Sequence, residues 1–182
     1  MNTVSRRQWL LLAAATPLLP AAHAATAPPE VQAALPGATL QGQGRLRFFG
    51  LHVYDIRLWA ASGFVPDRWA QTPLALEIEY ARTLYGRQIA ERSLDEMKRQ
   101  GEIAADTGSR WLAEMNRLFP DVNQGDRITG VKQPGVGARF FMNGQARGEL
   151  LDGDFARRFF GIWLAPQTSE PALRERLFGR QP

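Results

Sequence analysis

Three arginines and an aspartate interrupt an otherwise apolar segment, and their chemistry is the first question that the sequence raises. The segment GQGRLRFFGLHVYDIRLWA, residues 42–60, carries Arg45, Arg47, Asp55 and Arg57 among large apolar residues. An arginine presents a planar fork of donors that can bind a carboxylate through two parallel hydrogen bonds. A buried guanidinium without an anion is strongly destabilising. An arginine on the covered face of a sheet therefore needs a carboxylate from the protein or from a ligand.

The residue pattern leaves two directions open for these arginines. Neighbouring residues of a strand face opposite sides, so Arg45 and Arg47 share one face and the residues beside them share the other. Gly50 can change this alternation for the residues after it, because glycine adopts backbone angles that other residues avoid. One arginine then points inward and holds an anion, or all of them lie on a solvated face and pair with surface acids such as Glu77 and Glu79.

Other catalytic and metal-binding patterns are missing from the sequence. The chain has no cysteine, and His52 is the only histidine after residue 24, whereas transition metals usually need clustered thiolate or imidazole ligands. No G-x-S-x-G motif occurs, and the paired glycines at 42–44 and 135–137 lack the third glycine and the helix of a nucleotide-binding loop. We therefore expect no metal, no cofactor and no catalytic nucleophile.

The first 24 residues have the pattern of an export signal. They contain the pair Arg6-Arg7, an apolar run and the small-residue site Ala22-His23-Ala24. The arginine pair resembles the twin-arginine type, so we expect cleavage after Ala24 and a periplasmic protein. Cleavage lowers the formal net charge from +4 to +2, which is too little to indicate a nucleic-acid partner. No later segment approaches the roughly 20 apolar residues that a membrane span needs.

Turn residues and apolar periodicity divide the rest of the chain into short elements. Residues 25–37 are rich in alanine and proline and predict a flexible leader, and residues 38–180 predict one domain. The expected order is one bent strand or two strands within 42–60, a strand over 74–82 with Glu77 and Glu79 on its solvated face, helices over 86–100 and 109–119, three strands between 121 and 151, and helices over 154–165 and 170–179. This order predicts an α+β fold whose mainly antiparallel sheet carries helices on one face.

Five segments in order resemble the exported bacterial branch of the chalcone isomerase-like family. They are GQGRLRFFGLHVYDIRLWA, DEMKRQG, LFPDVNQGDRITGV, FFMNGQARGEL and DFARRFFGIWLAPQTSEPALRERLFG, and the resemblance spans residues 38–179. It implies an open-faced β-sandwich, in which a ligand cleft lies between a large antiparallel sheet and a helical layer. The family contains plant enzymes that close chalcones to flavanones, and plastid relatives that bind fatty acids without that reaction.

The resemblance also implies site residues. Tyr54 stands where the plant enzymes carry a threonine that polarises the substrate ketone, and the fatty-acid-binding relatives have a tyrosine there. In those relatives the tyrosine works with an upstream arginine on the ligand carboxylate. The matching residue is Arg47, with Arg45 as the alternative. Arg47 and Tyr54 are therefore the predicted ligand-binding residues.

The helix motif of the plant enzymes has only partial counterparts in this chain. Ile89 replaces its tyrosine, Arg92 its lysine and Glu96 its asparagine. The residues that close a chalcone are thus largely missing, and we expect no catalytic residues.

Three functions follow from the resemblance. The first is a periplasmic, non-catalytic binding protein for a fatty-acid-like or other amphiphilic carboxylate ligand. The second is an isomerase, or intramolecular lyase, of the chalcone isomerase type, in which Arg47 stabilises oxyanion charge. The third is a structural module with no ligand. For the first function, the residues expected to line the tail region are Trp111, Met115, Phe155 and Phe159.

Overall fold

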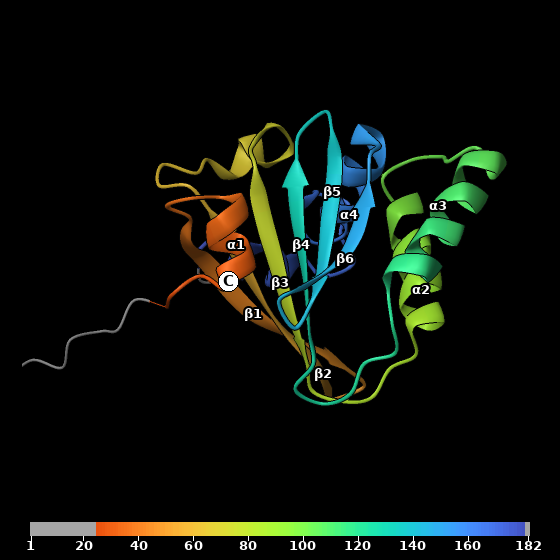
Figure 1. Cartoon of the computed structure of the whole chain (residues 1–182), viewed down its shortest axis with the longest axis horizontal. Coiled ribbons are helices and arrows are strands. Elements are labelled where there is room, and N and C mark those ends of the chain that lie inside the picture. The colour runs from red at the N-terminus through yellow and green to blue at the C-terminus, as the bar shows by residue number, and fades with distance from the viewer. Residues whose placement is uncertain (1–24, 181–182) are drawn as a thin grey trace, which may run out of the picture.

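The fold is built around one antiparallel sheet (Figure 1). The structure is a computed structural model of the 182-residue chain, and it describes residues 25–180. The predicted export signal lies outside the described residues. Each strand pairs antiparallel with the next strand along the chain, in the order β1-β2-β3-β4-β5-β6, which confirms the predicted α+β fold. The strands are β1 (Thr39–Phe48), β2 (Leu51–Ala60), β3 (Leu74–Tyr80), β4 (Arg127–Gln133), β5 (Gly137–Met142) and β6 (Gln145–Leu150).

Two of the connections are tight hairpin turns with the same backbone geometry. In the β5–β6 turn, Asn143 and Gly144 have φ angles of 51° and 83°, and in the β1–β2 turn Phe49 and Gly50 have 48° and 78°. Positive φ at both positions is the two-residue turn that Asn-Gly favours. Gly50 therefore belongs to a turn, and the segment 42–60 is two strands joined at that turn.

Helices cover one face of this sheet. They are α2 (Gly86–Lys98), α3 (Ala105–Leu118), α4 (Gly153–Leu164) and α5 (Pro171–Leu177). In Figure 1, α4 lies behind the sheet, and α2 and α3 lie beside its β6 edge. The carboxylate of Asp152 accepts hydrogen bonds from two backbone N–H groups at the start of α4 and, at 2.9 Å, from the indole of Trp111 in α3. One side chain thus caps α4 and fastens α3 to it.

Two glycines let α5 approach the sheet closely. A Cβ atom at Gly42 would come within 2.7 Å of the carbonyl carbon of Leu177, and one at Gly44 would overlap the side chain of Leu173. Both glycines lie inside β1, where any other residue would push α5 away. The paired glycines at 42–44 are therefore a packing feature of this strand.

The first helix, α1 (Pro29–Ala34), lies on the opposite face of the sheet (Figure 1). Residues 25–37 were expected to be a flexible leader, and this prediction is wrong for the helical part. Val31 of α1 is fully buried. It belongs to a second apolar cluster with Ala27, Trp59, Ala75 and Val131, which sits on the outer face of β2, β3 and β4.

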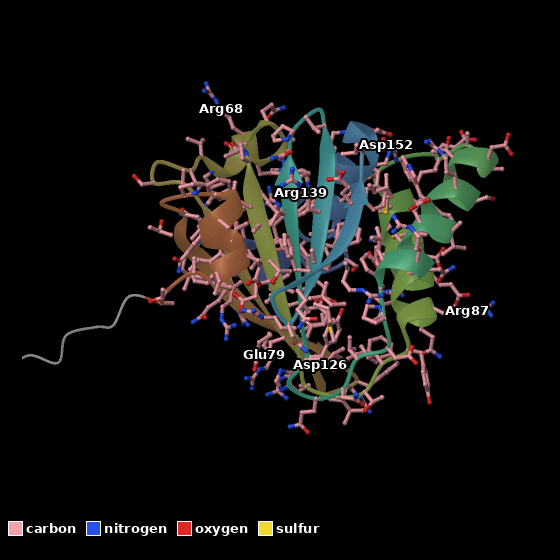
Figure 2. All side chains as sticks on the ribbon, in the orientation of Figure 1. Arg68, Glu79, Arg87, Asp126, Arg139 and Asp152 are labelled. Atoms are coloured by element: carbon pink, nitrogen blue, oxygen red, sulfur yellow. The ribbon has the colours of Figure 1, made fainter. Side chains whose placement is uncertain are left out.

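Charged groups are buried beneath α1. Glu30 of α1 forms an ion pair with Arg127 at 3.0 Å and accepts a hydrogen bond from Thr129 at 2.8 Å. Glu77 of β3 is only 4% exposed and accepts a hydrogen bond from the indole of Trp59 at 2.8 Å. The alternation in β3 was predicted correctly, but the solvated position expected for Glu77 is wrong because α1 covers it. Other charged side chains, such as Arg68 and Arg87, extend away from the fold (Figure 2).

One lysine is also buried. Lys132 of β4 donates a hydrogen bond from Nζ to the carbonyl oxygen of Ala70 at 2.8 Å, in the 3-10 helix η1 (Pro66–Gln71), and lies 5.8 Å from the ring centre of Trp69. Burial lowers the pKa of this amine from the ordinary 10.5 to about 8. Lys132 therefore holds η1 against the sheet, and desolvation of its ammonium group is the unfavourable consequence.

Candidate functional site

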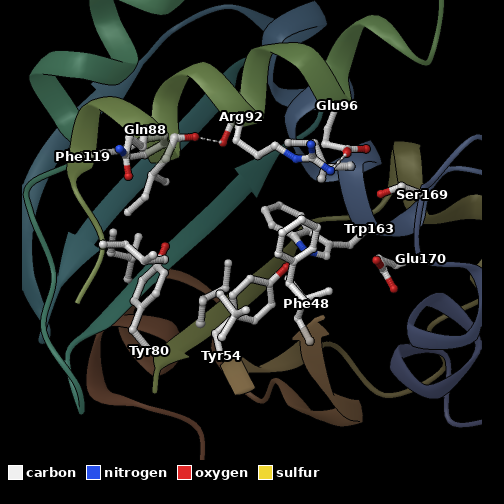
Figure 3. A pocket seen from close by; sticks show the side chains of 18 of the residues that line it. Phe48, Tyr54, Tyr80, Gln88, Arg92, Glu96, Phe119, Trp163, Ser169 and Glu170 are labelled. Carbon is white, nitrogen blue, oxygen red and sulfur yellow. Dashed lines mark hydrogen bonds and ion pairs between the residues drawn. The ribbon is translucent and has the colours of Figure 1, made fainter. Parts of the chain in front are cut away.

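A cavity of about 370 Å³ lies between the sheet and the helical layer (Figure 3). Residues of β1, β2 and β3 form one wall, and residues of α2, α4 and the segment before α5 form the other. Most of the wall is apolar, and it includes Leu46, Val53, Ile78, Leu84, Ile89 and Phe159. Sites for small molecules have volumes of about 300–1,000 Å³ and mostly apolar walls with a few polar groups. The cavity has the size and the lining of such a site.

An irregularity in strand pairing shapes the floor of the cavity. Leu46 of β1 pairs with Tyr54 of β2, but the next residue, Arg47, pairs with His52, so Val53 is an extra residue in β2. Such a bulge increases the local twist and changes the direction of nearby side chains. Val53 and Tyr54 both line the cavity as a result.

Tyr54 was predicted to bind a ligand, and its side chain lies in the cavity wall. Its hydroxyl oxygen accepts a hydrogen bond from the indole of Trp163 in α4 at 2.9 Å. Burial raises the pKa of Tyr54, and the bond from Trp163 opposes that effect only in part, so the phenol keeps its proton. None of the hydrogen bonds among residues 25–180 uses that proton. The hydroxyl can therefore donate to a guest in the cavity.

A polar cluster lies at one end of the cavity. Figure 3 shows Arg92, Glu96, Ser169 and Glu170 at that end, with the hydroxyl of Tyr54 directed toward Trp163 beside them. Arg92 and Glu96 form an ion pair of 2.6 Å along α2. The positive charge of Arg92 thus lies at the cavity wall and already has one carboxylate partner.

Glu96 has an oxygen without a hydrogen-bond partner. The side chain is only 8% exposed, and its Oε2 atom accepts no hydrogen bond from any described residue. The nearest cation on that side, Nε of Arg99, is 3.6 Å away. A buried acceptor that lacks a donor is unfavourable, so a guest with an O–H or N–H group would stabilise this end of the cavity.

The helix positions singled out by the resemblance do face the cavity. Ile89, Arg92 and Glu96 are spaced by three and four residues, which places them on one side of α2, and all three line the wall. Ile89 offers no hydroxyl where the plant motif has its tyrosine. This side of α2 therefore contributes an apolar surface and an ion pair.

Arg47 does not reach the cavity. Leu46 and Phe48 line the wall, and Arg47 between them faces the other way and donates a hydrogen bond to the carbonyl oxygen of Gly50 at 3.2 Å. The inward direction expected for Arg47 is therefore wrong. Its alternative, Arg45, also faces outward and pairs with Asp55 at 2.7 Å.

The remaining arginine of the opening segment, Arg57, follows the surface alternative. It forms ion pairs with Glu77 at 3.0 Å and with Glu79 at 3.4 Å. All three arginines of residues 42–60 thus lie on the outer face of the sheet. The cations of the cavity come from other elements: Arg92 lies in α2, and Arg82 follows β3.

Only one of the four expected tail residues lines the cavity. Phe159 of α4 does so, whereas Trp111, Met115 and Phe155 are fully buried in the core outside it. The rings of Trp111 and Phe155 pack edge to face, with centroids 5.7 Å apart, because α3 packs against α4 rather than over the cavity. Apolar periodicity marks which side of a helix is buried, but it does not say which buried residues meet a cavity.

Sequence reasoning missed Trp163 and Tyr80, which lie in the wall beside Tyr54. Tyr80 sits directly opposite Tyr54 in the β2–β3 pairing, and the two rings pack edge to face at 6.1 Å. Residues paired across two strands lie on one face of a sheet. A correct strand pairing would therefore have identified Tyr80, whereas Trp163 comes from α4 and needed the packing of that helix.

Two kinds of feature were not found among residues 25–180. Within residues 25–180, no three acidic or histidine side chains come together as metal ligands. No helix in that range has the length and apolar character needed to cross a bilayer. The charged and phenolic groups of the cavity wall are two arginines, two carboxylates and two phenols, which suit hydrogen bonding to an organic guest.

Comparison with known proteins places this arrangement in a family. A crystal structure of a fatty-acid binding protein of Arabidopsis thaliana superposes with a TM-score of 0.64 at 14% identity, over 79% of this chain and 87% of that one, and so shares the fold. An uncharacterised protein of Haemophilus influenzae is 31% identical over 129 residues, which are 71% of this chain and 62% of the relative. The profile of the chalcone isomerase-like family matches residues 22–179. The chain therefore belongs to the chalcone isomerase-like family.

Proposed function

We propose that this protein is a periplasmic, non-catalytic binding protein that holds a fatty-acid-like amphiphile in the cavity between sheet and helices. The observation that carries the proposal is an apolar cavity of about 370 Å³ that ends in a polar cluster. The fatty-acid binding protein of Arabidopsis thaliana, which has the same fold, supports the choice of ligand. The export pattern of the first 24 residues supports the periplasmic location.

The apolar wall accounts for binding of the ligand tail. Each methylene group that leaves water for an apolar site contributes about 0.8 kcal/mol, which is about fourfold in Kd. Affinity for saturated fatty acids should therefore increase by about this factor per methylene, and stop increasing when the cavity is full.

The polar cluster accounts for binding of the head, with Arg92 in the role first expected of Arg47. The guanidinium of Arg92 and the hydroxyl of Tyr54 can donate to the ligand, and the free oxygen of Glu96 can only accept. A carboxylic acid that keeps its proton satisfies both, because it donates O–H to Glu96 while its carbonyl oxygen accepts. Affinity for a fatty acid should therefore rise as the pH is lowered.

The test is a titration of the purified mature protein with lauric, myristic, palmitic and stearic acids, followed by calorimetry. Arg92→Ala and Tyr54→Phe should each weaken binding by about fivefold to tenfold, the equivalent of one hydrogen bond. Arg47→Ala is the matched control outside the cavity and should leave the affinity unchanged. If Arg47→Ala weakens binding as much as Arg92→Ala does, the assignment of the head site is wrong.

A second variant examines the role of Glu96. Glu96→Gln replaces an acceptor by a group that can donate, so the ionised carboxylate should bind about fivefold more tightly and the pH dependence should become smaller. Mass spectrometry of organic extracts from freshly purified protein gives an independent answer. No bound amphiphile, together with no affinity for any of the four acids, would refute ligand binding.

The non-catalytic part of the proposal rests on Ile89, which supplies no hydroxyl to the cavity. A spectrophotometric assay with chalcones and related enones checks it. Turnover that disappears in Arg92→Ala would show an isomerase of the chalcone isomerase type instead.

A further inference from the structure

The tip of the β1–β2 hairpin exposes three large apolar side chains. Phe49 is 89% exposed, Phe48 is 59% exposed and Leu51 is 55% exposed. The two phenylalanine rings contact each other edge to face, with centroids 4.5 Å apart. Single exposed apolar residues are common, but a contiguous exposed group of them indicates an interaction site.

The phenylalanine at the first position of this turn does not stabilise the turn. Phe49 has a φ of 48°, a left-handed conformation that disfavours side chains with a Cβ other than asparagine and aspartate. The β5–β6 turn has the same geometry and carries Asn143 at the corresponding position. Phe49 at the hairpin tip is therefore both exposed and in an unfavourable backbone conformation, whereas the β5–β6 turn has the favoured asparagine at the same position.

The hairpin tip lies at the entrance of the cavity. Phe48 contributes to the tip and also to the cavity wall, together with Leu46 of the same strand. In Figure 1 this hairpin projects at the lower end of β2, beyond the other strands. An apolar guest that enters beside Phe48 would pass the exposed rings.

Within the described residues, two arginines without a carboxylate partner lie near this entrance, and one carboxylate without an ion pair, Glu170, lies on the helical side of the cavity wall. Arg47 at the tip and Arg82 in the cavity wall form no ion pair with any carboxylate among residues 25–180. The carboxylate next to the tip, Asp55, is paired with Arg45 at 2.7 Å, and Glu79 is paired with Arg57 at 3.4 Å. Two cations thus remain available beside an apolar projection.

We propose that the β1–β2 hairpin docks on the surface of a lipid bilayer with anionic headgroups and brings the cavity entrance to that surface. The aromatic rings of Phe48 and Phe49 insert among the acyl chains, as amphipathic surface elements do, while Arg47 and Arg82 lie level with the lipid phosphates. A projecting tip suits insertion into a soft surface, whereas a protein partner would need a complementary pocket. Exchange of the cavity ligand at that surface rests on the proposed function, but the docking does not.

Phe49→Asn is the central test variant, because it removes the most exposed ring and restores the residue that the turn favours. We expect the mature protein to bind vesicles of phosphatidylglycerol and phosphatidylcholine in a flotation assay, and to bind less well at high salt. Phe49→Asn should bind these vesicles at least about tenfold less tightly, since burial of one phenylalanine contributes more than tenfold in affinity. Its melting temperature should be equal or higher, so loss of binding cannot be attributed to unfolding.

Two further variants test whether binding depends on the positive charge at the tip and on apolar residues outside the hairpin. Arg47→Gln should weaken binding to anionic vesicles by about fivefold, the contribution of one arginine near an anionic surface, and should have no effect with pure phosphatidylcholine. Leu151→Asn removes a side chain that is 67% exposed outside the hairpin, and should leave vesicle binding unchanged.

The outcomes distinguish this proposal from the proposed function. If the wild-type protein does not float with anionic vesicles, or if Phe49→Asn floats as well as wild type, docking is refuted. If the protein dimerises in sedimentation experiments and Phe49→Asn makes it monomeric, the tip binds a second copy instead, and docking is also refuted. Vesicle binding without any affinity for soluble fatty acids would support docking and refute the cavity ligand.

Discussion

Replacing Lys132 by methionine should stabilise the protein at neutral pH and remove part of its pH dependence. The ammonium group is buried in the folded state, which lowers its pKa from 10.5 to about 8. Between these two values the unfolded chain binds a proton that the folded protein does not bind. The free energy of unfolding contributed by this group therefore increases with pH over that window and is constant below and above it.

The magnitude follows from the two pKa values. Each pKa unit corresponds to 1.36 kcal/mol, so the step from 10.5 to about 8 is worth about 3 kcal/mol when complete. Methionine of similar length removes this penalty but leaves the carbonyl oxygen of Ala70 without its donor, which costs about 1–2 kcal/mol. The net gain at neutral pH should be about 1–2 kcal/mol, and it should vanish or reverse by about pH 10, where the lysine is largely neutral in the fold.

Urea denaturation of wild type and Lys132→Met, measured at several pH values, gives this difference directly. Comparison of the two proteins cancels the titration of all groups that they share. The other lysine of the chain, Lys98, is half exposed on α2 beside Asp95, so Lys98→Met is the control and should change stability by less than about 0.5 kcal/mol. A gain for Lys132→Met that is the same at every pH would refute the reasoning.

Two further predictions concern helices that pack on the two faces of the sheet. Glu30→Ala should destabilise the protein by about 2 kcal/mol, since it leaves Arg127 with one carboxylate fewer, and should increase hydrogen exchange in residues 29–35, whereas Glu30→Gln should have a smaller effect. Gly86→Ala should cost about 2–3 kcal/mol, because its Cβ would come within 2.7 Å of the carbonyl carbon of Pro120. The matched change Gly108→Ala, in α3 where a Cβ atom would lie at an ordinary contact distance of 3.7 Å from Ile103, should stabilise by about 0.5–1 kcal/mol, and equal effects of the two glycine changes would contradict this account.

Local chemistry in the sequence determined most of the elements. The alternation of residues 74–80, the Asn143-Gly144 turn and the apolar periodicity of α4 each depend on neighbours within a few residues, and the structure has these elements where they were expected. The spacing of Ile89, Arg92 and Glu96 likewise placed them on one side of a helix. Such patterns can be read from the chain because their cause lies within one or two turns of it.

The tertiary structure decided which faces of the sheet are covered by helices, and therefore which residues line the cavity. Strand parity separated Arg47 from Leu46, but only the packing of α2 and α4 showed that the cavity lies on the side of Leu46. Glu77 was placed on the correct face, yet α1 covers that face and buries it. Burial and cavity position depend on contacts between residues far apart in the chain. The sequence therefore placed Tyr54 on a strand and Arg92 on one side of a helix, and the packing of the helical layer decided that these two residues line the cavity whereas Arg47 does not.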